Sequence, residues 1–151
     1  MPAARKHAPT WDDVSRIALA LPEAGERISR DLRQWRVDEK LFVWERPLRR
    51  KEIEALGTSV PDGPILGARV EHVGAKEALL ADDPGVFFTT PHFDGHPSIL
   101  VRLDRIAMAE LDEVIIEAWL CRAPPRLARS TSRPRGRPHQ APARTLGRPN
   151  P

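Results

Sequence analysis

A chain of 151 residues, of which 40% are hydrophobic and 30% are charged, has the size and composition of one globular domain. Its single cysteine, Cys121, excludes an internal disulfide and a zinc site built from the cysteines of one chain. No uncharged apolar run approaches the roughly 18 residues of a membrane span, and the first residues lack the apolar stretch of a secretory signal. We therefore expect a cytoplasmic protein without a membrane partner.

The net charge of +3 conceals two regions of opposite sign. Seven of the 24 Lys and Arg residues, but none of the 21 acidic residues, lie after position 122. Residues 1–122 therefore carry 17 − 21 = −4 charges, whereas residues 123–151 carry +7. This last segment is rich in proline and poor in apolar residues, so it cannot offset the entropy cost of ordering. We predict a flexible N-terminus at 1–9, a folded domain at 10–122 and a disordered tail at 123–151.

The first predicted element is an amphipathic helix. Thr10 followed by Asp13 has the pattern of an N-terminal cap, and apolar residues then recur with helical spacing up to Leu21. Pro22 ends this helix, because its ring cannot continue the backbone hydrogen bonds.

A β-hairpin is predicted next, over residues 34–45, where aromatic and branched residues flank a polar Asp38-Glu39 break. Neither of these two residues favours a positive φ, so we expect a loop longer than two residues. Residues 48–56 predict a short helix that ends at Gly57.

Strands and helices alternate in the rest of the domain. Strands are expected at 65–70, 86–90 and 98–103, and helices at 75–81 and 111–119. The whole order predicts an α+β fold, with a mostly antiparallel sheet and the N- and C-terminal helices packed on one face as a two-layer sandwich.

The densest basic cluster of the domain surrounds the predicted hairpin. If the hairpin projects as a wing, these cations can neutralise phosphates while Trp35 or Trp44 stacks on bases. The alternative is that both tryptophans are core residues and that the cations pair with neighbouring glutamates. The candidate nucleic-acid-binding residues are Arg33, Arg36, Lys40, Arg46, Arg49, Arg50 and Lys51.

A second candidate site is the loop 91–97, which contains His92, Asp94 and His96. On an extended strand these three side chains would face one way, as a metal site requires. Gly95 and the flanking prolines indicate a turn instead, so we expect no metal there. The loop remains an alternative site for a small molecule or a protein, which a concave pocket beside it would favour.

Catalytic motifs are missing from the sequence. No serine lies in a Gly-x-Ser-x-Gly elbow, and no glycine-rich segment continues into Gly-Lys-Ser/Thr. We therefore expect a protein that is not an enzyme, with no catalytic residue and no cofactor.

Several blocks of the sequence, taken in order, resemble the MmcQ/YjbR family. They are Trp35-Arg36-Val37, residues 40–49, residues 87–95, residues 98–103 and Ala118-Trp119-Leu120. The resemblance covers nearly all of residues 10–127. It implies a compact α+β fold similar to bacterial frataxin and a DNA-binding role assigned to a double-wing surface, with no catalytic residue to carry over.

The chain departs from the family pattern in places. Residues 28–32 replace a stretch with Gly and Pro that usually precedes the first strand. Ala107 stands where an acidic helix cap is common, which costs about 1 kcal/mol of helix stability if nothing substitutes for it. Beyond Leu127 the chain becomes rich in Arg and Pro, a change that a shifted reading frame would produce.

The leading hypothesis from the sequence is a non-enzymatic protein that binds DNA nonspecifically through the hairpin cations, with added attraction from the tail. Because residues 1–122 are net negative, such binding must rely on local basic patches. Iron handling, by analogy with frataxin, has less support, since the first helix offers only Asp12 and Asp13 where an acidic ridge is needed.

Overall fold

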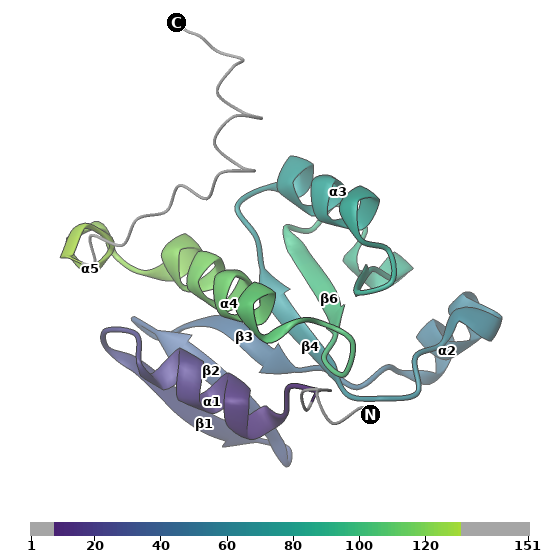
Figure 1. The fold of residues 1–151 in the computed structure, drawn as a ribbon, viewed down its shortest axis with the longest axis horizontal. Helices are drawn as coiled ribbons and strands as arrows, with labels where there is room; N and C mark the ends of the chain where they lie inside the picture. Colours follow the sequence, from purple (N-terminus) through teal and green to yellow (C-terminus); the bar gives the residue numbers. More distant parts are fainter. Residues whose placement is uncertain (1–7, 131–151) are drawn as a thin grey trace, which may run out of the picture.

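An antiparallel sheet with the strand order β1-β2-β3-β4-β6-β5 runs through the computed structural model, which describes residues 8–130 (Figure 1). The strands are β1 (Ala24–Ser29), β2 (Leu32–Val37), β3 (Lys40–Glu45), β4 (Ile65–Arg69), β5 (Phe87–Phe88) and β6 (Ser98–Arg102). The helices are α1 (Trp11–Leu19), α2 (Arg50–Leu56), α3 (Val73–Asp82), α4 (Met108–Arg122) and α5 (Pro125–Ser130), with 3-10 turns η1 (Gly57–Ser59) and η2 (Pro91–Phe93). Within the described range, no helix has the length and apolar character needed to cross a membrane.

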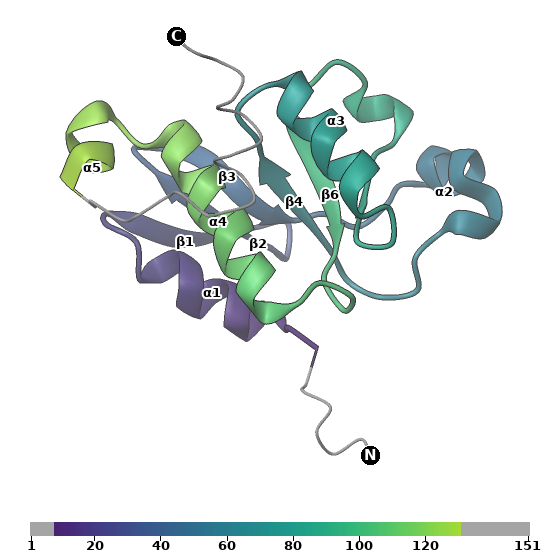
Figure 2. The same cartoon turned by 45° about the horizontal axis from the view of Figure 1, so that its top comes forward.

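Helices α1 and α4 cover one face of the sheet, while α2 and α5 lie at opposite ends of the molecule (Figures 1 and 2). Val14 from α1 and Ile115 and Trp119 from α4 are fully buried against the strands, each at 0% exposure. The predicted cap of α1 is present, because the Asp13 amide donates to Thr10 and the Thr10 amide donates to the Asp13 carboxylate. The predicted α+β class, with helices from both ends of the domain on one face, is confirmed.

A bulge in β3 explains why the sequence there does not alternate between polar and apolar residues. Trp35 pairs with Val43 and Arg36 with Leu41, which leaves Phe42 without a partner on β2. Phe42 and Val43 are both 0% exposed in the main core, as expected when a bulge turns two successive side chains to one side.

Trp44 therefore falls on the opposite face of the sheet, directly over Gly67. A Cβ atom at Gly67 would clash with the Trp44 ring, so only glycine fits beneath the indole. Trp44 packs there against a second, smaller apolar cluster that includes Ile65, Phe88 and Phe93. Part of this second face is thus covered without a long helix.

Both N-terminal hairpins close through two-residue turns of non-glycine residues. Arg30 and Asp31 have φ of 54° and 65°, and Asp38 and Glu39 have φ of 53° and 64°. The longer loop predicted at Asp38-Glu39 is therefore wrong. The twist of the strands favours a mirror-image turn with both φ positive, although this conformation costs roughly 1–2 kcal/mol per ordinary residue.

One described strand and one described α-helix were not predicted. Strand β1 lies at the sheet edge and has an almost fully exposed middle, so it lacks the apolar alternation of a half-buried strand. Helix α5 falls in the predicted tail, where Leu127 is only 7% exposed in the main core and Arg126 pairs with Glu23 at 3.2 Å. The folded region thus continues past 122 to 130, while the predictions for 1–7 and 131–151 lie outside the described residues.

Candidate nucleic-acid interface

Arg46, predicted to contact phosphates, lies inside the fold and is 7% exposed. Its guanidinium donates to both carboxylate oxygens of Glu52, at 2.9 and 2.7 Å, and Glu52 is 4% exposed. It also donates to the Pro47 carbonyl at 2.6 Å and lies 5.1 Å from the ring centre of Phe93. Turning Arg46 outward would leave the buried Glu52 carboxylate unpaired, which costs free energy. Arg46 is therefore no longer a candidate for phosphate contact.

Glu52 joins the start of α2 to the segment before η2. Besides Arg46, its carboxylate accepts hydrogen bonds from the Arg49 amide and the Thr90 hydroxyl, both at 2.9 Å. Burial raises the pKa of Glu52, but the hydrogen bonds from Arg46, Arg49 and Thr90 outweigh burial and hold this pKa below its usual value. A charged carboxylate is therefore the form that ties these segments together.

Lys76 on α3 holds the same loop from another side. It is 4% exposed, and its ammonium donates to the carbonyls of Phe93 at 2.6 Å and His96 at 3.1 Å. Burial lowers the pKa of Lys76, although the nearby Asp94 carboxylate partly opposes the shift. The backbone of the loop is thus fixed by a buried cation.

In the described part of the chain, the buried charged residues are Arg46, Glu52 and Lys76, and all of them contact residues 90–96. We call residues 46–56 together with residues 90–97 the α2–η2 unit. Burying charges costs free energy, and departures from an apolar interior concentrate at functional sites. This convergence makes the α2–η2 unit the candidate site of the protein.

The exposed residues of the α2–η2 unit come from both sites that the sequence predicted separately. Arg49, Arg50 and Lys51 are exposed and take part in no ion pair among residues 8–130. The structure therefore brings the basic end of α2 next to the histidine-containing loop.

The loop side chains lie at the surface. His92 and His96 are exposed and meet the Phe93 ring edge-on, at 4.8 and 6.5 Å between ring centres. Asp94 is exposed between them. Across the residues that the structure describes, no cluster of three or more His, Cys, Asp or Glu could hold a metal ion.

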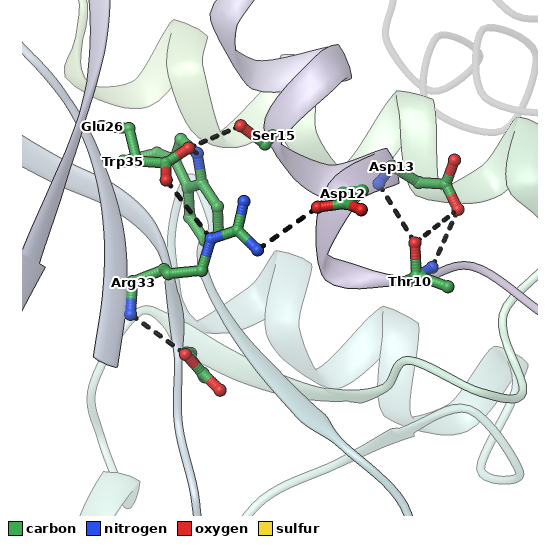
Figure 3. Close-up of polar contacts among 8 residues, drawn as sticks. Thr10, Asp12, Asp13, Ser15, Glu26, Arg33 and Trp35 are labelled. Carbon is green, nitrogen blue, oxygen red and sulfur yellow. Dashed lines mark hydrogen bonds and ion pairs between the residues drawn. The ribbon is translucent and has the colours of Figure 1, made fainter. Parts of the chain in front are cut away.

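Arg33 is engaged with acidic neighbours, as Figure 3 shows. Its guanidinium lies 3.3 Å from a carboxylate oxygen of Glu26 and 3.6 Å from one of Asp12. Glu26 also accepts hydrogen bonds from Ser15 and from the Trp35 indole. Arg33 thus braces β1, β2 and α1 together, and Trp35 is a core residue at 0% exposure.

Arg36 and Lys40 lie at the β2–β3 turn, away from α2. Arg36 donates to the Gln34 side chain at 2.9 Å and to the Glu39 carbonyl at 3.1 Å, whereas Lys40 is exposed. The length of β3, about 17 Å at 3.3 Å per residue, separates this turn from the end of the strand that leads to α2. The seven predicted residues therefore do not gather on one surface, and only those on α2 keep exposed, unpaired charges beside the loop.

Comparison with known proteins supports this fold. The YjbR family model matches residues 19–121. An uncharacterised protein of Mycobacterium bovis, Mb2600, is 52% identical over 124 residues, covering 80% of this chain and 94% of its own length, and Rv2570 of Mycobacterium tuberculosis matches equally. The crystal structure of Deinococcus radiodurans DR2400, with a DUF419 domain, aligns with a TM-score of 0.57 at 18% identity, covering 75% of this chain and 78% of that one. The chain belongs to the YjbR family.

Proposed function

We propose that the protein is a non-catalytic nucleic-acid-binding protein that contacts phosphates through the exposed side of the α2–η2 unit. One observation carries the proposal: every buried charge of the described chain is used to fix this unit, and the unit presents Arg49, Arg50 and Lys51 without ion-pair partners among residues 8–130. A rigid backbone that carries exposed cations suits phosphate contact, because little ordering of the backbone remains to be done on binding.

Such binding is nonspecific and depends on salt. Each phosphate neutralised on duplex DNA releases a counterion and contributes about 0.9 to the slope of log K against log salt. The net charge of −4 on residues 1–122 opposes approach of DNA, so the local cations must dominate, aided by the arginines of residues 123–151. In this proposal, the arginine-rich tail attracts DNA to the protein, and the α2–η2 unit makes the direct phosphate contacts.

The test is a comparison of two charge-matched variants of the full chain. One changes Arg49, Arg50 and Lys51 to Gln, and the control changes Arg27, Arg30 and Lys40 to Gln on the hairpins. Binding of a labelled duplex is measured at about 50 and 200 mM salt. We expect the α2 variant alone to bind more weakly and to lose about 2 to 3 units of salt slope. Wild-type affinity and slope in the α2 variant would overturn the proposal.

The bracing of the loop also favours a second function, docking of a protein on residues 91–97. Small-molecule binding there has less support, because neither the hollow beside Trp11 nor the one beside Arg27 borders the loop. Alanine at His92, Asp94 and His96 separates the two functions. Weaker duplex binding in this variant would assign the loop to the nucleic-acid interface, and unchanged duplex binding would leave the loop available for a protein partner.

A further inference from the structure

A hollow of about 260 Å³ opens beside α2, between the start of α1, the end of β3 and the segment before β4. Its lining is mostly apolar, with Trp11, Ile53 and several prolines, and its one charged residue is Glu45. Pockets for drug-sized ligands usually measure about 300–1,000 Å³. This hollow therefore suits something smaller, such as a single flat ring system.

Trp11 gives the hollow a fixed aromatic wall. Its ring stacks on Trp35, with 6.3 Å between ring centres and 19° between the planes. Trp35 is in turn held by a hydrogen bond of 3.0 Å from its indole nitrogen to Glu26. A braced indole at the edge of an apolar hollow is the kind of surface on which nucleic-acid bases stack.

Glu45 adds a hydrogen-bond acceptor to this wall. One of its oxygens accepts from the Arg33 amide at 3.0 Å, which fixes the carboxylate, and the other has no hydrogen-bond partner among the described residues. Carboxylates recognise the amino groups of bases, as in acceptance from N4 of cytosine. We expect such an acceptor to favour bases with an amino group over thymine, whose one donor on that edge is its N3–H.

Two cations lie at the start of α2, the helix whose Ile53 lines the hollow. Ile53, which lines the hollow and is 45% exposed, lies three residues after Arg50, so these two side chains share one side of the helix, and Arg49 is the extended residue that precedes its first turn. The apolar hollow fits a base, its single acceptor fits an amino group on that base, and the nearby cations fit the phosphates of the same nucleotide. A base in a duplex is stacked and paired, and cannot enter the hollow unless it is extruded.

We propose that this hollow takes one unpaired base of a single-stranded nucleic acid, with the flanking phosphates on Arg49 and Arg50. The inference rests on the proposed function and adds to it: a duplex is held by its phosphates alone, whereas a single strand that contains bases with amino groups also places a base in the hollow.

The experiment measures binding of the full chain to labelled oligomers of dC, rC and dT and to a duplex of the same length. We expect oligo-dC to bind roughly tenfold more tightly than oligo-dT. Binding of oligo-rC shows whether affinity depends on the sugar. Tighter binding of oligo-dC or oligo-rC than of oligo-dT supports the proposal. Equal binding of oligo-dC, oligo-dT and duplex would overturn the proposal for the hollow. The proposed function would still stand in that case if the Gln variant at Arg49, Arg50 and Lys51 binds all of them more weakly than the wild type.

Two variants test the wall and the acceptor. Glu45→Gln keeps an oxygen for the Arg33 amide but turns the other atom into a donor, so the preference should shift from oligo-dC toward oligo-dT, a change that simple loss of folding cannot produce. Trp11→Leu should weaken single-strand binding about tenfold and leave duplex binding unchanged. The control is Leu19→Ala, an exposed residue at the far end of α1. An unaltered base preference in Glu45→Gln would contradict the proposal.

Discussion

The main core buries apolar side chains, whereas the α2–η2 unit combines a small apolar cluster around Phe93 with buried charges. Between the sheet and helices α1 and α4, every buried residue of the core is apolar. In the α2–η2 unit, Arg46 and Glu52 are buried at 7% and 4% exposure, and Lys76 reaches in from α3 at 4%. The first region is stabilised by removing apolar surface from water. The second depends on a few directed contacts between charges, carbonyls and one hydroxyl.

The main core therefore accounts for the stability of the fold, whereas the buried charges account for the position of the exposed α2–η2 unit. Apolar packing tolerates many sequences of similar volume, whereas a buried ion pair adds little net stability compared with apolar residues of the same shape. Arg46 and Glu52 are therefore better explained by the position they impose on α2 and residues 90–97 than by the stability they provide. Variants in the two regions should accordingly change different properties.

Trp119→Ala should produce the largest loss of stability, about 3–5 kcal/mol, because it leaves a large cavity at a fully buried position of the main core. Urea unfolding followed by circular dichroism measures this loss. Leu19→Ala, at a position with 45% exposure, serves as the control and should change stability by less than about 1 kcal/mol. Similar losses in the two variants would mean that the core does not lie under α4.

Glu52→Ala should cost nearly as much, about 3 kcal/mol, because it leaves Arg46 buried without its partner. The matched control replaces the whole network with apolar residues, as Arg46→Met, Glu52→Leu and Thr90→Val together. We expect this triple variant to stay within about 1–2 kcal/mol of the wild type in urea. Its duplex affinity should nevertheless fall if the network positions the interface, and unchanged affinity would assign the network to stability alone.

The same contrast shows how far the sequence could predict the molecule. The helices and the antiparallel sheet were predictable, since Thr10, Asp13 and Pro22 act locally and apolar spacing repeats within each element. The Phe42 bulge was not predictable, because it depends on how β3 pairs with β2. Neither was the Asp38-Glu39 turn, where the twist of the strands overrides the preferences of the two residues.

The candidate site was predicted only in part, for a related reason. Pairing of the cations with neighbouring glutamates was the stated alternative, and it holds for Arg46, whose partner Glu52 is six residues away. The sequence did not show that this pair is buried, because burial depends on Thr90, which lies 38 residues from Glu52. Lys76 was not singled out at all, and its acceptor Phe93 is 17 residues away. Arg49 and its two neighbours have their predicted exposure, since the side chain of Glu52, the acid on the same turn, is directed inward to Arg46 and Thr90.

Lys76→Met should have a smaller and more local effect. The apolar side chain cannot donate to the Phe93 and His96 carbonyls, and two unsatisfied acceptors cost about 1–3 kcal/mol, less where water reaches them. Hydrogen exchange of residues 91–98 should accelerate while α1 and α4 stay protected. The control is Glu77→Gln, an exposed neighbour on the same helix, and equal exchange in both variants would show that Lys76 does not hold the loop.

The smallest expected effect is a dependence of stability on pH that belongs to the α2–η2 unit. The pKa of Glu52 in the folded protein lies below its usual value of 4.5, so the folded state favours the charged carboxylate. Its contribution to stability is therefore complete above pH 4.5 and disappears as the pH falls through the lower pKa of the folded state. Urea unfolding at pH 7, 5, 4 and 3 measures this loss.

The triple apolar variant at Arg46, Glu52 and Thr90 isolates this contribution, because its main core and the other carboxylates are those of the wild type. Asp13, Glu23 and Glu26 also have lowered pKa values, so both proteins lose stability in acid. Only the wild type has Glu52 to protonate, and its loss between pH 5 and pH 3 should exceed that of the variant. Parallel curves would mean that the carboxylate is not held in its charged form, and the buried charges would then not explain how α2 and residues 90–97 are fixed together.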